Sequence, residues 1–232
     1  MQHLDEHRFI DADTLAEALA TAIQRVLRIA IAARGRASLV VSGGRTPRRF
    51  FNRLAALPLD WRKVVITLAD ERWVEIDSPS SNEQLVRREL LRDEAANAQF
   101  IGLKSHHVLS VGAQTAWRAL ADMPRPFDAI VLGMGDDGHT ASLFPASPQL
   151  ADALNSALPP DCVVMLAPVA PQARVSLNLA ALLNSRRIVL HLQGAEKWAA
   201  YQQARVAGPI ELMPVRAVLH QHLVPIEVFW SP

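Results

Sequence analysis

A short loop in the middle of the sequence carries an acid and a histidine whose spacing suits proton transfer. Asp137 and His139 lie two residues apart within the glycine-rich residues 133–145. At that spacing a carboxylate can orient an imidazole and stabilise its protonated form, as a positioned general base requires. The pair predicts His139 as the base and Asp137 as the acid that orients it.

The same loop contains the spacing G-x-G-x-x-G, which after a strand is typical of dinucleotide-binding loops. Asp136 and Asp137 lie inside that spacing and would repel a pyrophosphate, and Pro145 interrupts the residues where the helix of such a site should continue. We therefore expect no dinucleotide here.

A metal site would need a third ligand beside Asp137 and His139, and no ligand spacing singles one out among His106, His107, His191, His220 and His222. We expect no metal.

A second candidate site is the loop with the sequence SGGRTP. Its glycines, Gly43 and Gly44, precede a predicted helix whose free N–H groups and dipole would favour an anion such as phosphate. Arg45 adds a positive charge, and Thr46 is expected to cap the helix ahead of Pro47. A tight strand-to-helix turn that needs positive φ would explain the two glycines equally well.

Charged side chains follow two further predicted strands. Asp70, Glu71 and Arg72 come directly after the apolar residues 64–69. Arg72 could hold phosphate oxygens, with the acids orienting it or the substrate hydroxyls. Lys197 is expected in the first turn of a helix, where a cation is disfavoured unless an anion lies nearby. On local grounds, solvated surface charge remains the alternative for both groups.

These loops belong to a repeated alternation of predicted strands and helices. Strands are expected at residues 37–41, 64–69, 127–132, 162–167, 187–192, 217–220 and 226–230. Helices are expected at residues 14–33, from residue 47 onwards, and at 81–92, 114–121, 173–183 and 195–204. This order predicts an α/β fold with a mainly parallel sheet and helices on both faces. Ligands bind beyond the carboxyl ends of such strands, so the charged loops should converge there.

Composition limits the class of protein. The 232 residues are 50% hydrophobic and 20% charged, which is enough for a substantial core and excludes a mainly disordered chain. The net charge of +1 would not hold the chain on nucleic acid or an anionic membrane. A single cysteine favours a reducing compartment, and no window reaches the roughly 18 apolar residues of a membrane span. We expect one soluble, cytoplasmic domain over residues 1–232.

Taken together, the motifs closely resemble the 6-phosphogluconolactonases of the short bacterial type. The matching segments run from about residue 37 to 200 and read SGGRTP, DERWV followed by SNEQLVRREL, LGMGDDGHTASLFP, RVSLNLAALLNSRRIVL and GAEK. The resemblance implies a Rossmann-like, doubly wound sheet related to that of hexosamine-6-phosphate deaminases. It also implies hydrolysis of 6-phosphogluconolactone, a small phosphorylated sugar lactone, in the pentose phosphate pathway. No cofactor or metal is implied.

The resemblance assigns roles by position. His139 matches the catalytic base and Asp137 its partner. The phosphate-contacting positions of the family are matched by Arg72, Lys197, Gly43, Gly44 and Thr46. Arg45 stands where related sugar-phosphate enzymes commonly carry serine. The matching motifs also contain Asp70, Glu71, Ser81 and Asn82. Asp70 is grouped with substrate binding, and the other three have no assigned contact.

In the implied reaction, His139 takes a proton from water as it attacks the lactone carbonyl, and the resulting oxyanion collapses by ring opening. The donors that hold this oxyanion are not assigned by the sequence. A hexosamine-6-phosphate deaminase is the first alternative, but that family carries DEY and DGHxAFNEP where this chain has Arg72 and the residues Leu-Phe-Pro at 143–145. A non-catalytic sugar-phosphate-binding module is the second, although no DNA-binding module is appended and the base is intact.

Overall fold

The computed structural model describes residues 4–104, 106 and 108–232. His107, considered above as a metal ligand, lies outside the described residues. The larger of two sheets has seven strands, and every pairing within it is parallel. In spatial order these are β1 (Asp5–Arg8), β10 (Ile226–Ser231), β9 (Ile188–Gln193), β6 (Ala129–Leu132), β2 (Ala37–Val41), β3 (Val64–Leu68) and β5 (Gln99–Ile101).

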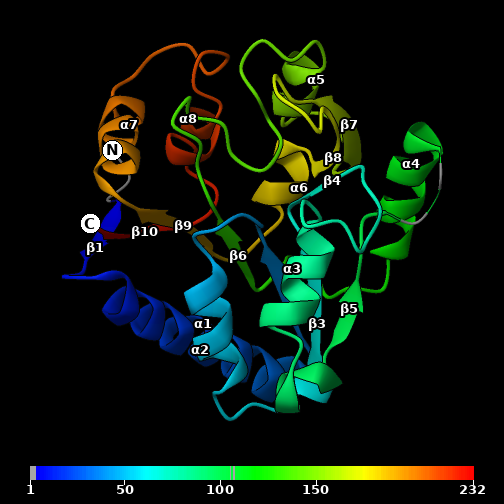
Figure 1. Cartoon of the computed structure of the whole chain (residues 1–232), viewed down its shortest axis with the longest axis vertical. Coiled ribbons are helices and arrows are strands. Elements are labelled where there is room, and N and C mark those ends of the chain that lie inside the picture. The colour runs from blue at the N-terminus through cyan, green and yellow to red at the C-terminus, as the bar shows by residue number, and fades with distance from the viewer. Residues whose placement is uncertain (1–3, 105, 107) are drawn as a thin grey trace.

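Helices cover both faces of this sheet. Figure 1 shows α1 (Ala12–Arg34) and α2 (Arg48–Ala55) on one side of the strands, and α7 (Ala195–Arg205) and α8 (Val215–Leu219) on the other. Every residue of β2, β3 and β6 is buried, as a parallel sheet covered on both faces requires. The predicted α/β architecture is confirmed.

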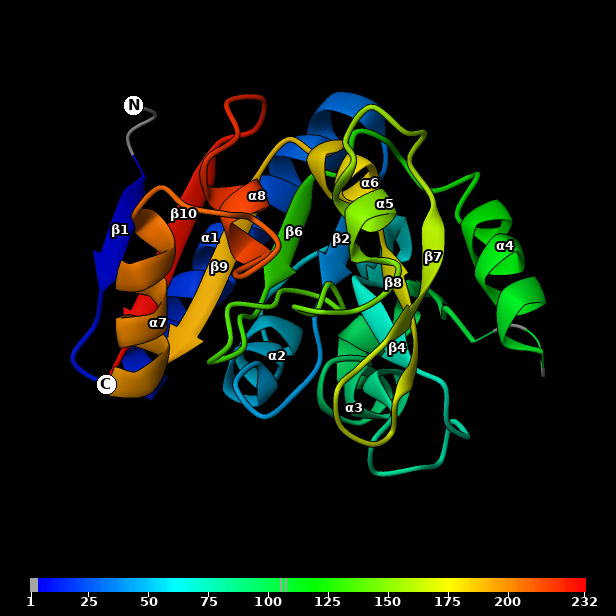
Figure 2. The same ribbon diagram turned by 90° about the horizontal axis from the view of Figure 1, so that it is seen from above.

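A second sheet of three antiparallel strands stands beside the first (Figure 2). It is formed by β4 (Asp70–Arg72), β8 (Ala173–Leu177) and β7 (Cys162–Leu166), in that order. The two sheets join at Ala69, whose N–H donates to the Val41 carbonyl oxygen and whose own oxygen accepts from the N–H of Leu177. The remaining helices are α3 (Asn82–Glu89), α4 (Leu109–Ala119), α5 (Leu150–Leu154) and α6 (Leu179–Leu183), with 3₁₀ turns at Trp61–Lys63 and Asp93–Asn97. No helix within the described part of the chain is long and apolar enough to cross a membrane.

Two predicted elements are wrong. The helix expected at residues 173–183 is strand β8 followed by the short helix α6. The strand forms because it pairs on both edges, with β4 and β7, and Asn178 then starts the helix by accepting a hydrogen bond from the N–H of Ala181 at 2.9 Å. Instead of the strand expected at residues 217–220, the chain forms the end of helix α8 and its C-cap, His220. The helix begins after Pro214, a residue whose ring favours helical backbone angles.

Candidate active site

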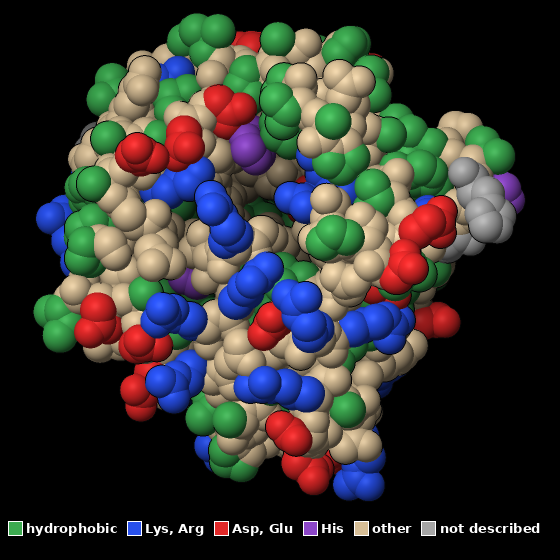
Figure 3. All heavy atoms as spheres, viewed as in Figure 1, with side chains coloured by type: hydrophobic (Ala, Val, Ile, Leu, Met, Phe, Trp, Pro, Cys, Tyr) green, Lys and Arg blue, Asp and Glu red, His purple; other side chains and the backbone are tan. Residues whose placement is uncertain are grey.

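The carboxyl ends of the parallel strands meet at a pocket of about 360 Å³. Figure 3 shows it as a hollow surrounded by Lys and Arg side chains. The pocket is large enough for a small metabolite. The structure brings eight of the nine predicted site residues to its wall, namely Gly43, Gly44, Arg45, Thr46, Asp70, Arg72, His139 and Lys197. The ninth, Asp137, lies behind His139 rather than on the wall.

The loop after β6 holds His139 and Asp137 in contact. Nδ1 of His139 lies 2.6 Å from Oδ1 of Asp137, which also accepts the backbone N–H of His139 at 3.1 Å. A carboxylate at Nδ1 retains the proton there, which leaves Nε2 free to accept one. Burial works to raise the pKa of Asp137, but the hydrogen bonds and charge of His139 outweigh it and lower that pKa. Gly135 permits this contact, since a Cβ there would lie 2.0 Å from Nδ1 of His139.

The glycine loop after β2 is shaped by two different requirements. Gly44 has φ of +99°, so it does serve a turn that favours glycine. Gly43 is needed for close approach, because a Cβ there would lie 1.8 Å from Oδ1 of Asn82. Helix α2 begins one residue later than expected, with Pro47 at the N-cap and no side chain capping it. Thr46 is therefore not the cap, and it lines the pocket instead.

Lys197 lies in the first turn of α7, as predicted. Its Nζ is 2.8 Å from Oδ1 of Asp136, which precedes the Asp137–His139 pair. This ion pair ties the start of α7 to the loop after β6. An anion that enters the pocket would compete with Asp136 for the ammonium group.

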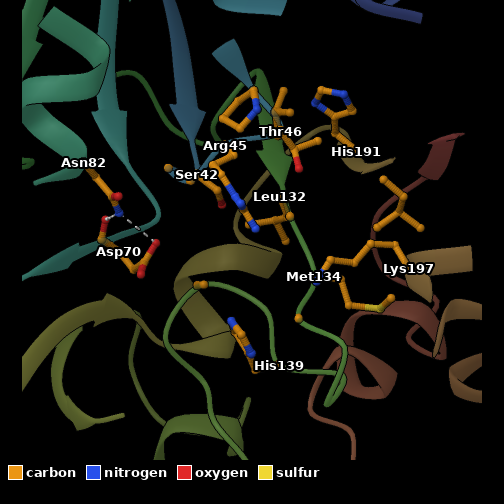
Figure 4. Close-up of a pocket in the computed structure, with 18 of the residues that line it drawn as sticks. Ser42, Arg45, Thr46, Asp70, Asn82, Leu132, Met134, His139, His191 and Lys197 are labelled. Atoms are coloured by element: carbon orange, nitrogen blue, oxygen red, sulfur yellow. Dashed lines mark hydrogen bonds between the residues drawn. The ribbon is translucent and has the colours of Figure 1, made fainter. Parts of the chain in front are cut away.

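The DER segment, expected as a loop, is strand β4 of the small sheet. Asp70 is buried, and its Oδ2 accepts from Oγ of Ser142 at 2.5 Å. The amide of Asn82 donates to the backbone oxygen of Asp70 at 2.8 Å (Figure 4). Nη1 of Arg72 donates to the Ser80 carbonyl oxygen at 2.8 Å. The acid and the arginine of this segment are thus held by their neighbours at one wall of the pocket.

Glu71 points away from the pocket and anchors helix α3. Its carboxylate accepts the backbone N–H groups of Arg72, Asn82 and Glu83 at 2.7 to 2.8 Å, and the Ser81 hydroxyl at 3.1 Å. Burial raises the pKa of Glu71 although the backbone hydrogen bonds oppose it. Ser81 also caps the helix by accepting a hydrogen bond from the N–H of Gln84. Glu71 and Ser81 therefore position Asn82, which reaches the pocket wall.

Sequence reasoning missed several polar residues of the wall, among them Arg174 and His191. Arg174 comes from β8, which was expected to be helical, and it is only 6% exposed. His191 comes from β9, where a histidine inside an apolar strand was the available signal. Burial lowers the pKa of His191 to about 4, and its Nδ1 has no hydrogen-bond partner among the described residues. Figure 4 shows His191 toward Thr46, with His139 at the opposite side of the pocket.

Metal-ligating side chains gather elsewhere. Within the described ranges, the group able to offer three ligand atoms is Asp5, His7 and Glu227. These residues lie on β1 and β10, in the part of the sheet near the start of β10, whereas the pocket lies beyond the carboxyl ends of the strands. Arg187 already forms an ion pair with Glu227. The group is separate from His139 and its neighbours.

Known proteins resemble this chain over nearly its whole length. A protein named 6-phosphogluconolactonase from Pseudomonas putida is 45% identical over 227 residues, which cover 97% of this chain and 92% of that protein. A 6-phosphogluconolactonase from Rhizobium meliloti is 41% identical, with 97% and 98% covered. A crystal structure of a 6-phosphogluconolactonase from Shewanella baltica superposes with a TM-score of 0.95 at 47% identity, covering 99% of this chain and 98% of the other.

A monomeric glucosamine-6-phosphate deaminase shares the fold at 15% identity, with a TM-score of 0.79 and 97% of each chain covered. At that identity the likeness concerns the fold alone. The family described as glucosamine-6-phosphate isomerases and 6-phosphogluconolactonase matches residues 10–230. This match and the relatives above 40% identity show that the chain belongs to the family of glucosamine-6-phosphate isomerases and 6-phosphogluconolactonases.

Proposed function

We propose that this protein hydrolyses 6-phosphogluconolactone to 6-phosphogluconate, the reaction named by its relatives and a step of the pentose phosphate pathway. The observation that carries the proposal is the contact between His139 and Asp137 beside a pocket that is also lined by the glycine loop before α2. A base, an acid that orients it and a phosphate site suffice for metal-free opening of a phosphorylated lactone.

The phosphate is bound by backbone N–H groups at the start of α2, by Lys197 and by Arg72. A helix N-terminus favours an anion, and the two cations complement its charge. Lys197 exchanges its ion pair with Asp136 for one with the phosphate. Asp70, whose carboxylate is oriented by Ser142, accepts a hydrogen bond from a sugar hydroxyl. Binding at these points sets the distance between the lactone carbonyl and the base.

His139 then removes a proton from water at Nε2 while the water oxygen bonds to the carbonyl carbon. Asp137 stabilises the imidazolium that forms, because its carboxylate accepts a hydrogen bond from the Nδ1–H group. When the tetrahedral intermediate collapses, the bond from the carbonyl carbon to the ring oxygen breaks, and the imidazolium returns its proton to that oxygen. A positioned base of this kind contributes on the order of 10² to 10⁴ in rate.

Deamination is disfavoured by the residues after His139. Leu143 is fully buried and Phe144 packs with its ring centroid 4.3 Å from that of His139. Neither can supply the acid that a deaminase carries in this segment to open the sugar ring.

The experiment is a proton-release assay on freshly generated 6-phosphogluconolactone, corrected for spontaneous hydrolysis at each pH. A parallel assay measures ammonia from glucosamine 6-phosphate. We expect lactone opening without ammonia release, and full activity after dialysis against a chelator. Complete loss on chelation with recovery by zinc would contradict the metal-free mechanism, and ammonia release would contradict the substrate class.

A further inference from the structure

The small sheet presents an ordered set of polar side chains to the loop that carries His139. In the antiparallel pairing of β4 with β8, Asp70 lies opposite Ser176, and Arg72 lies opposite Arg174. Residues directly opposite each other share a face of the sheet, as do residues two apart on one strand. All four side chains therefore lie on one face.

Ser142 docks the His139 loop on this face. Its hydroxyl donates to Oδ2 of Asp70 at 2.5 Å, and its backbone N–H donates to Oγ of Ser176 at 3.2 Å. The next pair along the same face is Arg72 and Arg174. Arg72 reaches back to the carbonyl oxygen of Ser80.

Arg174 instead extends toward the catalytic base. Its guanidinium carbon lies 5.9 Å from the centroid of the Phe144 ring, and that ring is 4.3 Å from the ring of His139. Arg174, Phe144 and His139 all line the pocket. Thr46 of the phosphate loop lies on the opposite side of the pocket from His139 (Figure 4). Arg174 thus belongs to the end of the pocket where the bond to water forms.

The surroundings of Arg174 leave its charge incompletely satisfied. The side chain is buried, and its Nε has no hydrogen-bond partner among the described residues. A second cation, Arg72, stands directly opposite, and like charges in that position repel. Burial and Arg72 lower the pKa of Arg174, while Asp70 and Glu71 oppose this, and a guanidinium keeps its proton in proteins. A buried cation with an open donor is suited to an electron-rich oxygen of a ligand.

We propose that Arg174 donates a hydrogen bond to the lactone carbonyl oxygen and stabilises the oxyanion formed when water adds. This role rests on the proposed function, and it supplies the donor that the sequence left unassigned. As the water oxygen bonds to the carbonyl carbon, the π electron pair of the carbonyl moves onto its oxygen beside the guanidinium. The pair returns when the bond to the ring oxygen breaks. Arg174 keeps all its protons, since His139 alone carries the proton from water to the ring oxygen.

A kinetic test compares two lactones that differ only in the phosphate, 6-phosphogluconolactone and glucono-1,5-lactone. Arg174→Gln should lower kcat/KM on both by a similar factor of about 10² to 10³, as loss of a donor to an oxyanion typically does. Arg174→Lys should recover part of the rate, because it restores the charge without the planar fork of donors. Lys197→Ala is the comparison variant, and its loss should be much larger on the phosphorylated lactone than on glucono-1,5-lactone.

A binding test avoids reliance on turnover. The product 6-phosphogluconate and glucitol 6-phosphate carry the same phosphate, but only the product has a carboxylate at the reacting carbon. Calorimetry should show that Arg174→Gln weakens the product at least about tenfold and leaves glucitol 6-phosphate nearly unchanged. Lys197→Ala should weaken both. Retained glucitol 6-phosphate binding also demonstrates that the variant is folded.

The outcomes separate the two proposals. If the wild-type protein opens neither lactone, the proposed function is wrong. Active wild-type protein with an Arg174→Gln variant of unchanged kcat/KM would overturn the role of Arg174 alone. A loss confined to the phosphorylated lactone, with equal weakening of both phosphate ligands, would make Arg174 a phosphate ligand and would also overturn the inference. If Arg174→Gln fails to fold, Arg174→Lys on both lactones decides the question by the same criteria.

Discussion

The two sheets that meet at the pocket contribute to it in different ways. The large parallel sheet contributes loops, in which strand, loop and helix follow one another directly, as in the glycine loop between β2 and α2. The small antiparallel sheet contributes buried charged side chains from strands that are far apart in the sequence, such as Arg72 and Arg174. The first arrangement offers backbone N–H groups to a ligand, whereas the second offers a desolvated cation and an oriented acid. A single pocket therefore combines locally and non-locally built parts.

The His139 loop connects the two regions. It follows β6 of the large sheet, but Ser142 attaches it to Asp70 and Ser176 of the small sheet. The position of His139 therefore depends on both sheets. Substitutions on either side can test whether the two regions have the separate roles described here.

The largest effect is expected at His139, the proposed base. His139→Asn should lower kcat by about 10² or more, because asparagine keeps hydrogen bonding but cannot accept a proton from water at neutral pH. Product affinity should stay nearly intact, since the phosphate site is unchanged. Initial rates and calorimetry with 6-phosphogluconate measure both quantities. If the variant keeps a kcat near that of the wild type, His139 is not the base, and Asp70 is the next candidate.

A smaller effect is expected on the side of the large sheet. Lys197→Ala should raise KM for 6-phosphogluconolactone by about 10-fold or more, as removal of a charge-assisted contact to the phosphate predicts. Activity on glucono-1,5-lactone should hardly change. Equal proportional losses on both lactones would place Lys197 at the reacting carbon and remove the contrast between the two regions.

The attachment between the sheets is expected to affect stability. Ser142→Ala leaves Oδ2 of the buried Asp70 without its donor, which should lower the free energy of unfolding by about 1 to 3 kcal/mol. Ser110→Ala, at an exposed serine of α4, is the control and should change it by less than about 0.5 kcal/mol. Urea denaturation of both variants provides the measurement. Equal stabilities would show that this contact does not hold the loop on the small sheet.

The smallest effect concerns pH. The pKa of Asp137 is lowered in the folded protein, so its carboxylate stabilises the fold above the unfolded value of about 3.9. That stabilisation is lost as the pH falls through the lowered value. The difference in unfolding free energy between wild type and Asp137→Asn should thus shrink as the pH falls from about 5 to below about 4. Denaturant titrations across this range measure it, and a difference that grows on acidification would contradict the sign.

Local sequence patterns were enough to predict most strands of the parallel sheet and most of the residues that line the pocket. Apolar runs predicted β2, β3, β6 and β9 with errors of at most two residues at either end. Eight of the nine predicted site residues line the pocket, because each follows a strand whose carboxyl end lies at the same edge. The family resemblance assigned their roles, which the experiments above test.

Non-local pairing explains what was missed. The residues of β8 were compatible with a helix, and only the two antiparallel neighbours made them a strand. Glu71 stood in the same charged segment as Asp70 and Arg72, yet alternation along β4 turned it toward the start of α3. The residues next to β8 and Glu71 in the sequence do not indicate these distant partners.

The sequence by itself determined the alternation of strands and helices, the glycine loops and the Asp137–His139 pair, because these depend on residues within a few positions of one another. Only the tertiary structure decided which charges are buried and what they face. Arg174 is charged and would be expected at the surface from the sequence alone, but the pairing of β8 with β4 and β7 buries it near Phe144, which packs on His139. Desolvation is set by everything that packs around a side chain, including segments far along the chain, so a local pattern does not contain it.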